Sequence, residues 1–299
     1  VAGAGFLFLL TRGLALRGLV AGDAFVAGSL GLVIALTLLF TGLPVMQMML
    51  IPFRDADGAW ALAPFFERLT DPKIWRFACF YSGSTCGVAW NSLILAISVG
   101  VLSTLLGLAF ALVLTRTNVR FRSAFRTLSL LPIITPPFVI GLAIILLFGL
   151  SGNVTQFVAT QVGLEPTRWI YGYTGILIAQ LLSFTPIAFL VLIGVVEAIS
   201  PSLEEAAQTL RADRWNTFKT VTWPLMRPGL ANAFLLGFIE SMADFGNPLV
   251  LGGNFNVLST EVFFSVVGSQ NDQGRAAVLA AILLLYTIGA FMLQQRWLG

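Results

Sequence analysis

Six long apolar segments constrain this chain more than any other feature of its sequence. They lie at residues 25–50, 91–115, 127–149, 173–197, 229–251 and 276–296. A helix needs about 20 predominantly apolar residues to cross a hydrocarbon core of about 30 Å, and each segment meets that length. The backbone must satisfy its own hydrogen bonds inside lipid, and the segments are too long for barrel strands of about 9–11 residues. The sequence therefore predicts an all-α, polytopic transmembrane bundle of about six spans.

Composition supports this fold class and excludes several functions. Apolar residues make up 57% of the chain, charged residues 10%, and the mean hydropathy is +0.89. The chain has no His, and two Cys cannot complete a structural zinc site. Lys73 and Lys219, the two lysines of the chain, lack the glycine-rich lead-in of a phosphate-binding loop. We therefore expect no catalytic residue, no metal site and no bound cofactor, and the singly scattered basic residues give no nucleic-acid surface.

The distribution of Lys and Arg predicts the orientation of the spans. If the first span enters from the cytoplasm, eleven basic residues lie on the inner side and six on the outer side. The loop 116–126 carries four Arg and no acid, which favours a cytoplasmic position for that loop and for both ends of the six-span core. Residues 1–24 are interpreted as the end of a truncated helix followed by a cytoplasmic segment, and residues 25–299 as one transmembrane domain.

The outer loop at about 51–90 contains both cysteines, Cys79 and Cys86. A disulfide is feasible because the outer side is oxidising, but a spacing of seven does not prove one. The alternative is two free, small apolar residues at the membrane interface. Both interpretations stay open at this point.

A polar stretch at 200–228 separates the fourth and fifth apolar segments. Ser202 and Glu205 have the spacing of a capping box, which predicts that a short helix begins there. An apolar stripe follows on one face, formed by Ala206, Ala207 and Leu210, with Leu203 one turn earlier. A second amphipathic piece contains Trp215 and Phe218. Two prolines downstream are expected to break the run and turn the chain back toward the membrane.

This stretch resembles the EAA loop of type I ABC importer permeases, which have a MetI-like architecture. The similarity rests on Glu205-Ala206-Ala207 with Phe218, Pro224 and Pro228 downstream, and it extends over roughly residues 85–296. It implies two short helices, one of which sits in a groove of a cytoplasmic ATPase and transmits its closure to the channel. The coupling residues that it implies are Glu204, Glu205, Ala206, Ala207, Leu210, Arg211, Phe218, Pro224 and Pro228.

The resemblance also implies partners and a location. They are a cytoplasmic ABC ATPase that carries ATP and Mg, a second permease half that is fused or separate, and a periplasmic substrate-binding protein. The expected location is a bacterial inner membrane, and the chain itself is expected not to be an enzyme.

One residue departs from the family pattern. The family usually has Gly in the turn seven positions into the motif, where this sequence has Arg211. If that turn requires a positive φ, a residue with a Cβ costs on the order of 1 kcal/mol there. We therefore expect strain or a reshaped turn at Arg211.

The fifth apolar segment contains two acids, Glu240 and Asp244, spaced to share one helical face. Ionisable groups inside a membrane are costly, so they are expected to face a bundle interior or a water-filled cavity. Two interpretations remain open. The acids line the substrate pathway together with Asn247, or they are buried structural partners of Asn232, Asn247 or a polar group on a neighbouring helix.

The stretch 243–263 resembles the permeases that take up ferric iron, which makes ferric iron the expected cargo of an ATP-driven importer. Relatives in the same family carry phosphonates, thiamine, polyamines or sulfate, and these remain alternative cargoes. The alternative function is an ion-gradient-driven secondary transporter in which Glu240 and Asp244 relay protons or bind sodium. Glycines such as Gly100, Gly107 and Gly141 are predicted to serve close helix packing.

Overall fold

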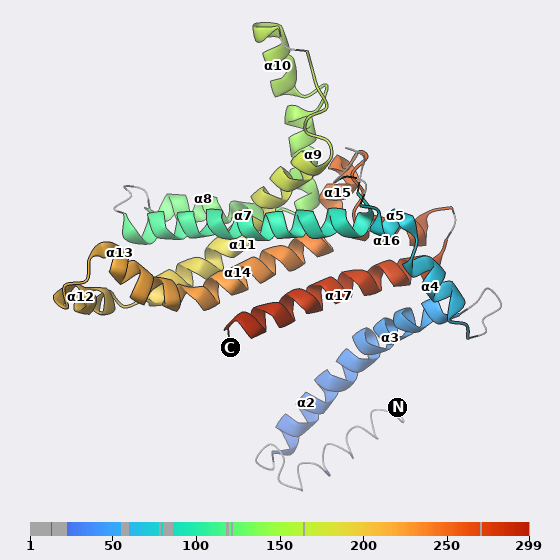
Figure 1. Cartoon of the computed structure of the whole chain (residues 1–299), viewed down its shortest axis with the longest axis horizontal. Coiled ribbons are helices and arrows are strands. Elements are labelled where there is room, and N and C mark those ends of the chain that lie inside the picture. Colours follow the sequence, from blue (N-terminus) through green and yellow to red (C-terminus); the bar gives the residue numbers. More distant parts are fainter. Residues whose placement is uncertain are drawn as a thin grey trace. The chain divides into compact units, whose positions relative to one another are not determined.

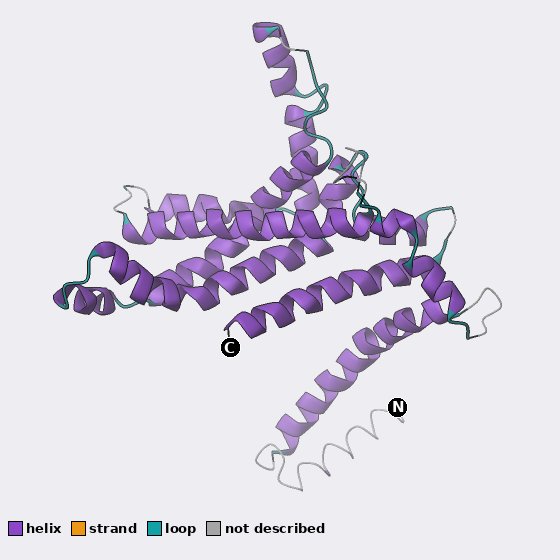
Figure 2. Cartoon of the chain, in the orientation of Figure 1, coloured by secondary structure: helices purple, strands orange, loops and turns teal. Residues whose placement is uncertain are grey.

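The computed structural model describes residues 13, 23–54, 60–77, 79, 86–117, 120, 122–163, 165–269 and 271–298. Helices dominate these residues, and the only extended pairing among them is an isolated bridge between Arg54 and Trp60 (Figure 2). The prediction of an all-α chain is therefore confirmed. The predicted N-terminal segment 1–24 lies almost entirely outside the described residues. The chain divides into two compact units, residues 1–66 and 67–299.

The first unit contains one long apolar helical run, from Phe25 to Phe53. It is built from α2 (Ala24–Thr37), the π-helical turn η2 (Leu38–Gly42), α3 (Leu43–Leu50) and the 3-10 turn η3 (Ile51–Phe53). Asp23 caps its start, because the Asp23 carboxylate accepts hydrogen bonds from the N–H groups of Phe25 and Val26 at 2.9 and 3.2 Å. The helix α4 (Ala63–Leu69) begins in this unit and crosses its boundary.

The second unit holds the other described helices, of which the α-helices are labelled in Figure 1. They are α5 (Pro72–Trp75), α7 (Val88–Arg116), α8 (Arg122–Ile134), α9 (Pro137–Phe148), α10 (Asn153–Val162), α11 (Tyr173–Ala198), α12 (Pro201–Thr209), α13 (Arg214–Thr217), the π-helical turn η4 (Phe218–Thr222), α14 (Trp223–Ala243), α15 (Gly246–Leu251), α16 (Leu258–Val267) and α17 (Gln273–Leu298).

Five described helical runs are long and apolar enough to cross a membrane. They are Phe25–Phe53, Val88–Arg116, Pro137–Val162, Tyr173–Ala198 and Gln273–Leu298. The remaining predicted span, the fifth, corresponds to α14, whose 21 residues reach about 31 Å at 1.5 Å per residue. It is less apolar because it includes Arg227 and Glu240.

Two predicted spans, 127–149 and 229–251, are wrong as continuous helices. In the first, α8 ends at Ile134 and α9 begins at Pro137, because Pro136 lacks an N–H and disfavours helical backbone in the residue before it. In the second, α14 ends at Ala243 and α15 begins at Gly246. The spans are therefore shifted or broken relative to the apolar windows of the sequence.

Three helices, α7, α11 and α14, pack side by side along the centre of the second unit (Figure 1). Glycines allow their backbones to approach closely. A Cβ added to Gly107 on α7 would lie 2.7 Å from the backbone N of Phe189 on α11, and one added to Gly100 would lie 2.9 Å from the Phe234 ring on α14. The predicted packing role of these two glycines is confirmed. The same three helices supply the buried core residues Leu114, Leu192 and Met226, together with Phe189.

Candidate functional site

The predicted coupling loop forms two short helical pieces, α12 and the α13–η4 run, at the end of the second unit where α7 finishes (Figure 1). α12 begins at Pro201, with Ser200 as its N-cap residue. The predicted capping box is therefore wrong, since Ser202 already lies inside the helix and Ser200 Oγ is hydrogen bonded to Ser202 Oγ at 2.7 Å. Proline is favoured at the first helical position because its missing N–H is not needed there, which explains the earlier start.

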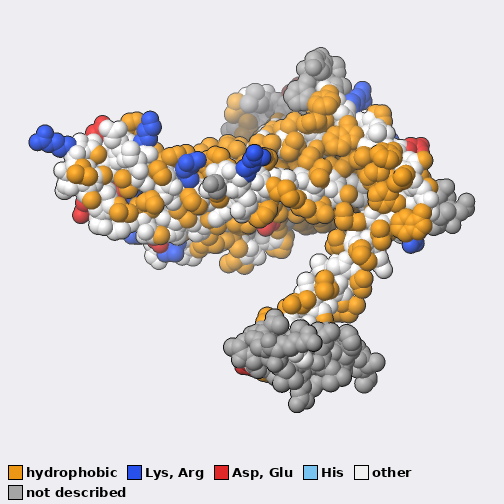
Figure 3. Space-filling view, turned by 60° about the horizontal axis from the view of Figure 1, so that its bottom comes forward, with side chains coloured by type: hydrophobic (Ala, Val, Ile, Leu, Met, Phe, Trp, Pro, Cys, Tyr) orange, Lys and Arg blue, Asp and Glu red, His pale blue; other side chains and the backbone are white. Residues whose placement is uncertain are grey.

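The apolar stripe of this loop is exposed. Leu210 is 83% exposed and Leu203 47%, Ala206 is exposed, and Ala207 is half-buried. Glu205 is also exposed and has no hydrogen bond or ion pair to another described residue. Figure 3 shows charged side chains at the same end of the second unit, at left in that view, with hydrophobic side chains over the neighbouring flank. Exposed apolar side chains framed by charge are typical of a protein-binding surface.

Arg211 lies in the turn after α12 with a φ of +64°. The N–H of Arg211 donates to Gln208 O at 2.9 Å, and the N–H of Ala212 donates to Ala207 O at 3.1 Å. This pair of hydrogen bonds is the Schellman ending of a helix, in which glycine is the favoured residue at the left-handed position. The turn therefore has the left-handed backbone conformation that favours glycine, although the residue in it is an arginine.

Glu204 connects α12 to two other elements. Its two carboxylate oxygens accept one hydrogen bond each, at 2.7 Å, from the two terminal nitrogens of Arg116 in the last turn of α7. Thr222 Oγ1 in η4 donates a third, at 2.9 Å, to Glu204 Oε1. The hydrogen bond from Arg116 and, to a smaller extent, the one from Thr222 hold the pKa of Glu204 below its usual value, against the opposing effect of burial.

The aromatic part of the loop leads directly into the membrane helix. The Trp215 and Phe218 rings are stacked with their centroids 5.8 Å apart, and Phe218 is 6.3 Å from the Trp223 ring. η4 continues into α14 without a break, with Pro224 in the first turn of α14 and Pro228 inside it. The expectation that these prolines interrupt the helix is wrong. Pro224 comes directly after the π-helical turn η4, where the helix is locally widened, and Pro228 is accommodated inside α14.

Asp244 is held by a buried polar network rather than placed on a helical face. It follows the last residue of α14, and its carboxylate accepts hydrogen bonds from Gln180 Nε2 on α11 at 2.9 Å and from Asn247 Nδ2 on α15 at 2.8 Å. The N–H groups of Gly246 and Asn247 also donate to it, at 3.0 and 3.3 Å. Ser241 Oγ donates to Gln180 Oε1 at 2.7 Å. The carboxylate therefore caps α15 and ties it to α11 and α14.

Glu240 lies one turn earlier, in a different setting. Its side chain is half-buried and has no hydrogen bond to another described residue. Asn232, its suggested partner, instead accepts a hydrogen bond from Gln294 Nε2 on α17 at 2.6 Å. The structure therefore separates two acids that the sequence placed on one face. Asp244 has the partners expected of a structural group, whereas Glu240 has none among the described residues.

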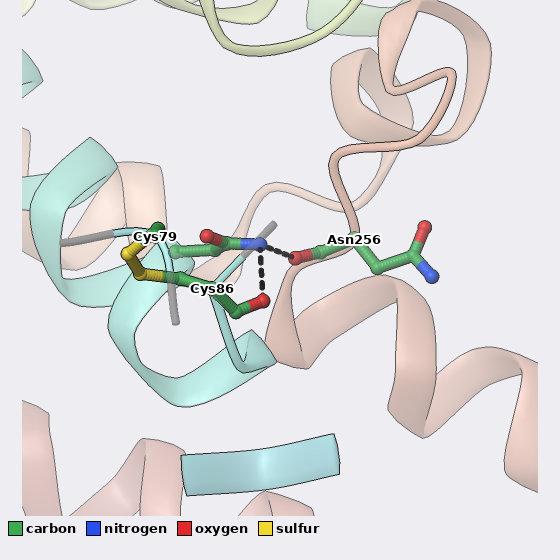
Figure 4. Close-up of a disulfide and its surroundings, with 4 residues drawn as sticks. Cys79, Cys86 and Asn256 are labelled. Atoms are coloured by element: carbon green, nitrogen blue, oxygen red, sulfur yellow. Dashed lines mark hydrogen bonds between the residues drawn. A yellow bond between two sulfur atoms is a disulfide. The ribbon is translucent and has the colours of Figure 1, made fainter. Parts of the chain in front are cut away.

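Cys79 and Cys86 form a disulfide, with their Cα atoms 4.9 Å apart, close to the start of α7 (Figure 4). The neighbouring Asn91 Nδ2 donates to Cys86 O at 3.4 Å and to Asn256 O at 2.9 Å, which joins this segment to the loop before α16. The sequence offered the pairing as one of two alternatives.

A network of ion pairs that the sequence did not predict lies at the same end of the second unit as the Cys79–Cys86 disulfide. Arg275 at the start of α17 is 3.3 Å from Glu261 and 3.8 Å from Asp71. Arg68 lies 3.4 Å from Asp272. Arg68 and Asp71 are far in the sequence from Glu261, Asp272 and Arg275 and carry no local motif, so only the tertiary structure shows that they meet.

Comparison with known proteins gives a family match. The profile of a family described as "binding-protein-dependent transport system inner membrane component" matches residues 103–297. A putative ferric transport system permease protein of Haemophilus influenzae is 42% identical over 99% of this chain, and a ferric transport system permease protein of Actinobacillus pleuropneumoniae is 43% identical over 93%. The chain spans 45% and 39% of the length of these two relatives.

A solved structure supports the same fold. In the crystal structure of a bacterial alginate ABC transporter in complex with alginate pentasaccharide-bound periplasmic protein, one chain is similar with a TM-score of 0.73 and 17% identity. The match covers 93% of this chain and 96% of that one. At this identity the likeness supports the helical architecture alone.

Proposed function

Because this chain belongs to the family of binding-protein-dependent transport system inner membrane components, we propose that it forms half of the translocation channel of an ATP-driven importer. The two ferric permeases that are similar to this chain are more than twice its length. This difference supports a channel that is completed by a second permease half, fused or separate. A periplasmic binding protein delivers the cargo. A cytoplasmic ATPase binds ATP and Mg and supplies the energy, while this chain binds no cofactor.

The observation that carries this proposal is the exposed face of α12. Leu203, Ala206 and Leu210 present apolar surface at the polar end of the helical bundle. A helix with an apolar stripe that its own chain leaves uncovered is suited to docking in a groove of another protein. In the proposed complex this groove belongs to the ATPase, and Glu205 contributes a charged contact beside it.

The proposed orientation places α12 in the cytoplasm. The segment 116–126, with its four Arg, begins at the same end of the bundle, where Arg116 contacts Glu204. The start of α7 and the Cys79–Cys86 disulfide then lie on the outer side, where an oxidising environment preserves the bond.

The proposed cargo is ferric iron, supported by the names of the two permeases that are 42% and 43% identical to this chain. Glu240 is the acid proposed to face the pathway, because a half-buried carboxylate without a protein partner suits a cationic cargo. Asn247 is fully buried beside Asp244 and acts as a structural partner of the pathway helix. Phosphonate, thiamine, polyamine and sulfate are the alternative cargoes to ferric iron.

The alternative, an ion-driven carrier that uses both acids, is disfavoured by the setting of Asp244. Four N–H donors already occupy its carboxylate and hold it between α11 and α15, which suits a structural role better than a relay.

The test uses two substitutions that add the same charge to different faces of α12. Leu203→Lys lies in the apolar stripe, and Gln208→Lys lies on another exposed face of the same helix. The ATPase should co-purify with the unmodified channel and with the Gln208→Lys variant, but not with Leu203→Lys, while both variants insert into the membrane. ATPase bound equally by all three would contradict the docking surface.

A second measurement identifies the energy source and the cargo. Proteoliposomes containing the complete complex should take up ferric iron from its loaded binding protein only when ATP is supplied inside. Uptake driven by an ion gradient without the ATPase would support the carrier, and uptake of sulfate in place of iron would overturn the cargo assignment.

A further inference from the structure

α12 is attached to the membrane helices with little burial of its own residues. None of its nine residues is buried, and its strongest polar contacts run through the single side chain of Glu204. A helix that transmits a conformational change to the membrane helices needs a stable contact with them. Because none of its residues is buried, the polar contacts of Glu204 are the most specific connection, beside the two chain connections and the packing of α12 against α13 and η4.

Arg116 and Thr222, the two partners of Glu204, are both close in the sequence to well-packed core residues. Arg116 follows Leu114 by two residues, and Leu114 is 1% exposed in the core between α7 and α11. Thr222 is itself buried, and it precedes the fully buried Met226 by one helical turn at the start of α14. The carboxylate of Glu204 therefore joins α12 to two separate helices of the bundle.

The geometry of this contact resists both sliding and rotation. Two parallel N–H to O hydrogen bonds of 2.7 Å fix the plane of the guanidinium group of Arg116 relative to the carboxylate of Glu204. The third hydrogen bond, from Thr222, holds the carboxylate from another side at 2.9 Å. The Glu204 side chain is 20% exposed and that of Arg116 is 37% exposed, so water competes only partly for these groups.

We propose that Arg116, Glu204 and Thr222, here called the Glu204 link, carry the movement of α12 to α7 and α14, and so set how much cargo crosses for each ATP hydrolysed. This inference rests on the function proposed above. It gives the two neighbouring acids different roles. Glu205 faces outward toward the ATPase, and Glu204 faces inward and fastens the docking helix to the channel.

The experiment measures ATP hydrolysis and ferric iron uptake together, in proteoliposomes that contain the complete complex and iron-loaded binding protein. Arg116→Gln should leave ATPase co-purification at the unmodified level, because Arg116 lies outside the docking face. The amount of iron taken up per ATP hydrolysed should fall by about fivefold or more, the lower end of typical coupling strengths. Arg116→Lys should have an intermediate effect, because Lys keeps the charge but cannot make the paired hydrogen bonds.

A charge exchange separates a transmitting role from a merely stabilising one. The double variant Arg116→Glu with Glu204→Arg restores the ion pair in reverse and should recover part of the uptake per ATP, whereas Arg116→Glu alone should not. The matched control is Arg122→Gln. It removes the 3.5 Å contact between Arg122 and Glu197, a more exposed pair that joins α8 to α11 at the same end of the bundle, and it should leave the ratio unchanged.

Three results would overturn the link. They are an unchanged ratio in Arg116→Gln, an equal loss in Arg122→Gln, and a charge exchange that recovers nothing although the variant inserts and binds the ATPase. Failure of the underlying function is a separate outcome, since it would appear as absence of the ATPase from the unmodified complex.

Discussion

Two single residues, Arg211 and Asp244, occupy unusual settings that the structure explains. Arg211 takes a left-handed backbone at the end of α12, and Asp244 leaves the line of α14 to cap α15. In both cases the local backbone decides what the side chain can do. Each setting predicts the effect of one substitution.

Replacing Arg211 by glycine should stabilise the turn. A residue with a Cβ costs about 1 kcal/mol at a left-handed position, so Arg211→Gly should raise the midpoint of thermal unfolding in detergent. Arg211→Ala is the control, because it removes the same charge and keeps the Cβ. Equal midpoints for the two variants would show that the arginine side chain, rather than the backbone, determines stability here.

Asp244 and Glu240 should respond differently to the same change. Asp244→Asn places an NH₂ group among four donors and leaves some of them unpaired, which should destabilise the folded protein by about 1–3 kcal/mol. Glu240→Gln should change thermal stability little and reduce iron uptake, since its carboxylate has no partner among the described residues. Similar losses of stability in both variants would argue against separate roles.

At the scale of elements, the central bundle depends on close contact between helices that carry small residues where they cross. Gly107 meets the backbone of α11, and Gly229 on α14 meets Val195, which a Cβ would approach to 2.4 Å. Helices in lipid gain no hydrophobic drive toward one another, so their association depends on such close packing.

Gly107→Ala should therefore separate α7 from α11. The added Cβ would lie 2.7 Å from a backbone atom, which cannot move without shifting the helix, and overpacking of this kind costs about 1–3 kcal/mol. Gly194→Ala on α11 is the matched control, because its Cβ would meet no atom within 4 Å. A fall in the detergent unfolding midpoint confined to Gly107→Ala is expected, and an equal fall in both would contradict the packing argument.

At the scale of the whole molecule, the ion pairs between described residues lie at two ends of the second unit, the coupling end with α12 and the end where α7 begins. The second carries the disulfide and the ion pairs of Arg275 with Asp71 and Glu261. Such a distribution suits a channel that meets a different partner on each side of the membrane.

The disulfide gives a direct measure of which side the second end faces. Protein purified from a bacterial membrane without reductant and then denatured should contain no free thiol, because Cys79 and Cys86 are paired. After reduction, two thiols should titrate, the number that the sequence contains. Two thiols before reduction would place this loop in a reducing compartment and reverse the proposed orientation.

The sequence determined that lipid surrounds most of this protein, that the chain is helical, where the spans approximately lie, and that a polar loop occupies residues 200–228. These follow from local physics, because a long apolar segment must form helix in lipid whatever surrounds it. The positive φ at Arg211 was raised only as a condition, and it came from the glycine usual at that position of the EAA loop rather than from the local residues.

The tertiary structure decided which distant groups meet. Glu204 and Arg116 are 88 residues apart, and Gln180 and Asp244 are 64 apart, so no local pattern pairs either couple. It also decided where helices break, since the loss of helix at Asp244 is compensated by hydrogen bonds from α11 and α15. Local sequence specifies that an acid inside a membrane needs a partner, but only the packed helices specify which residue that partner is.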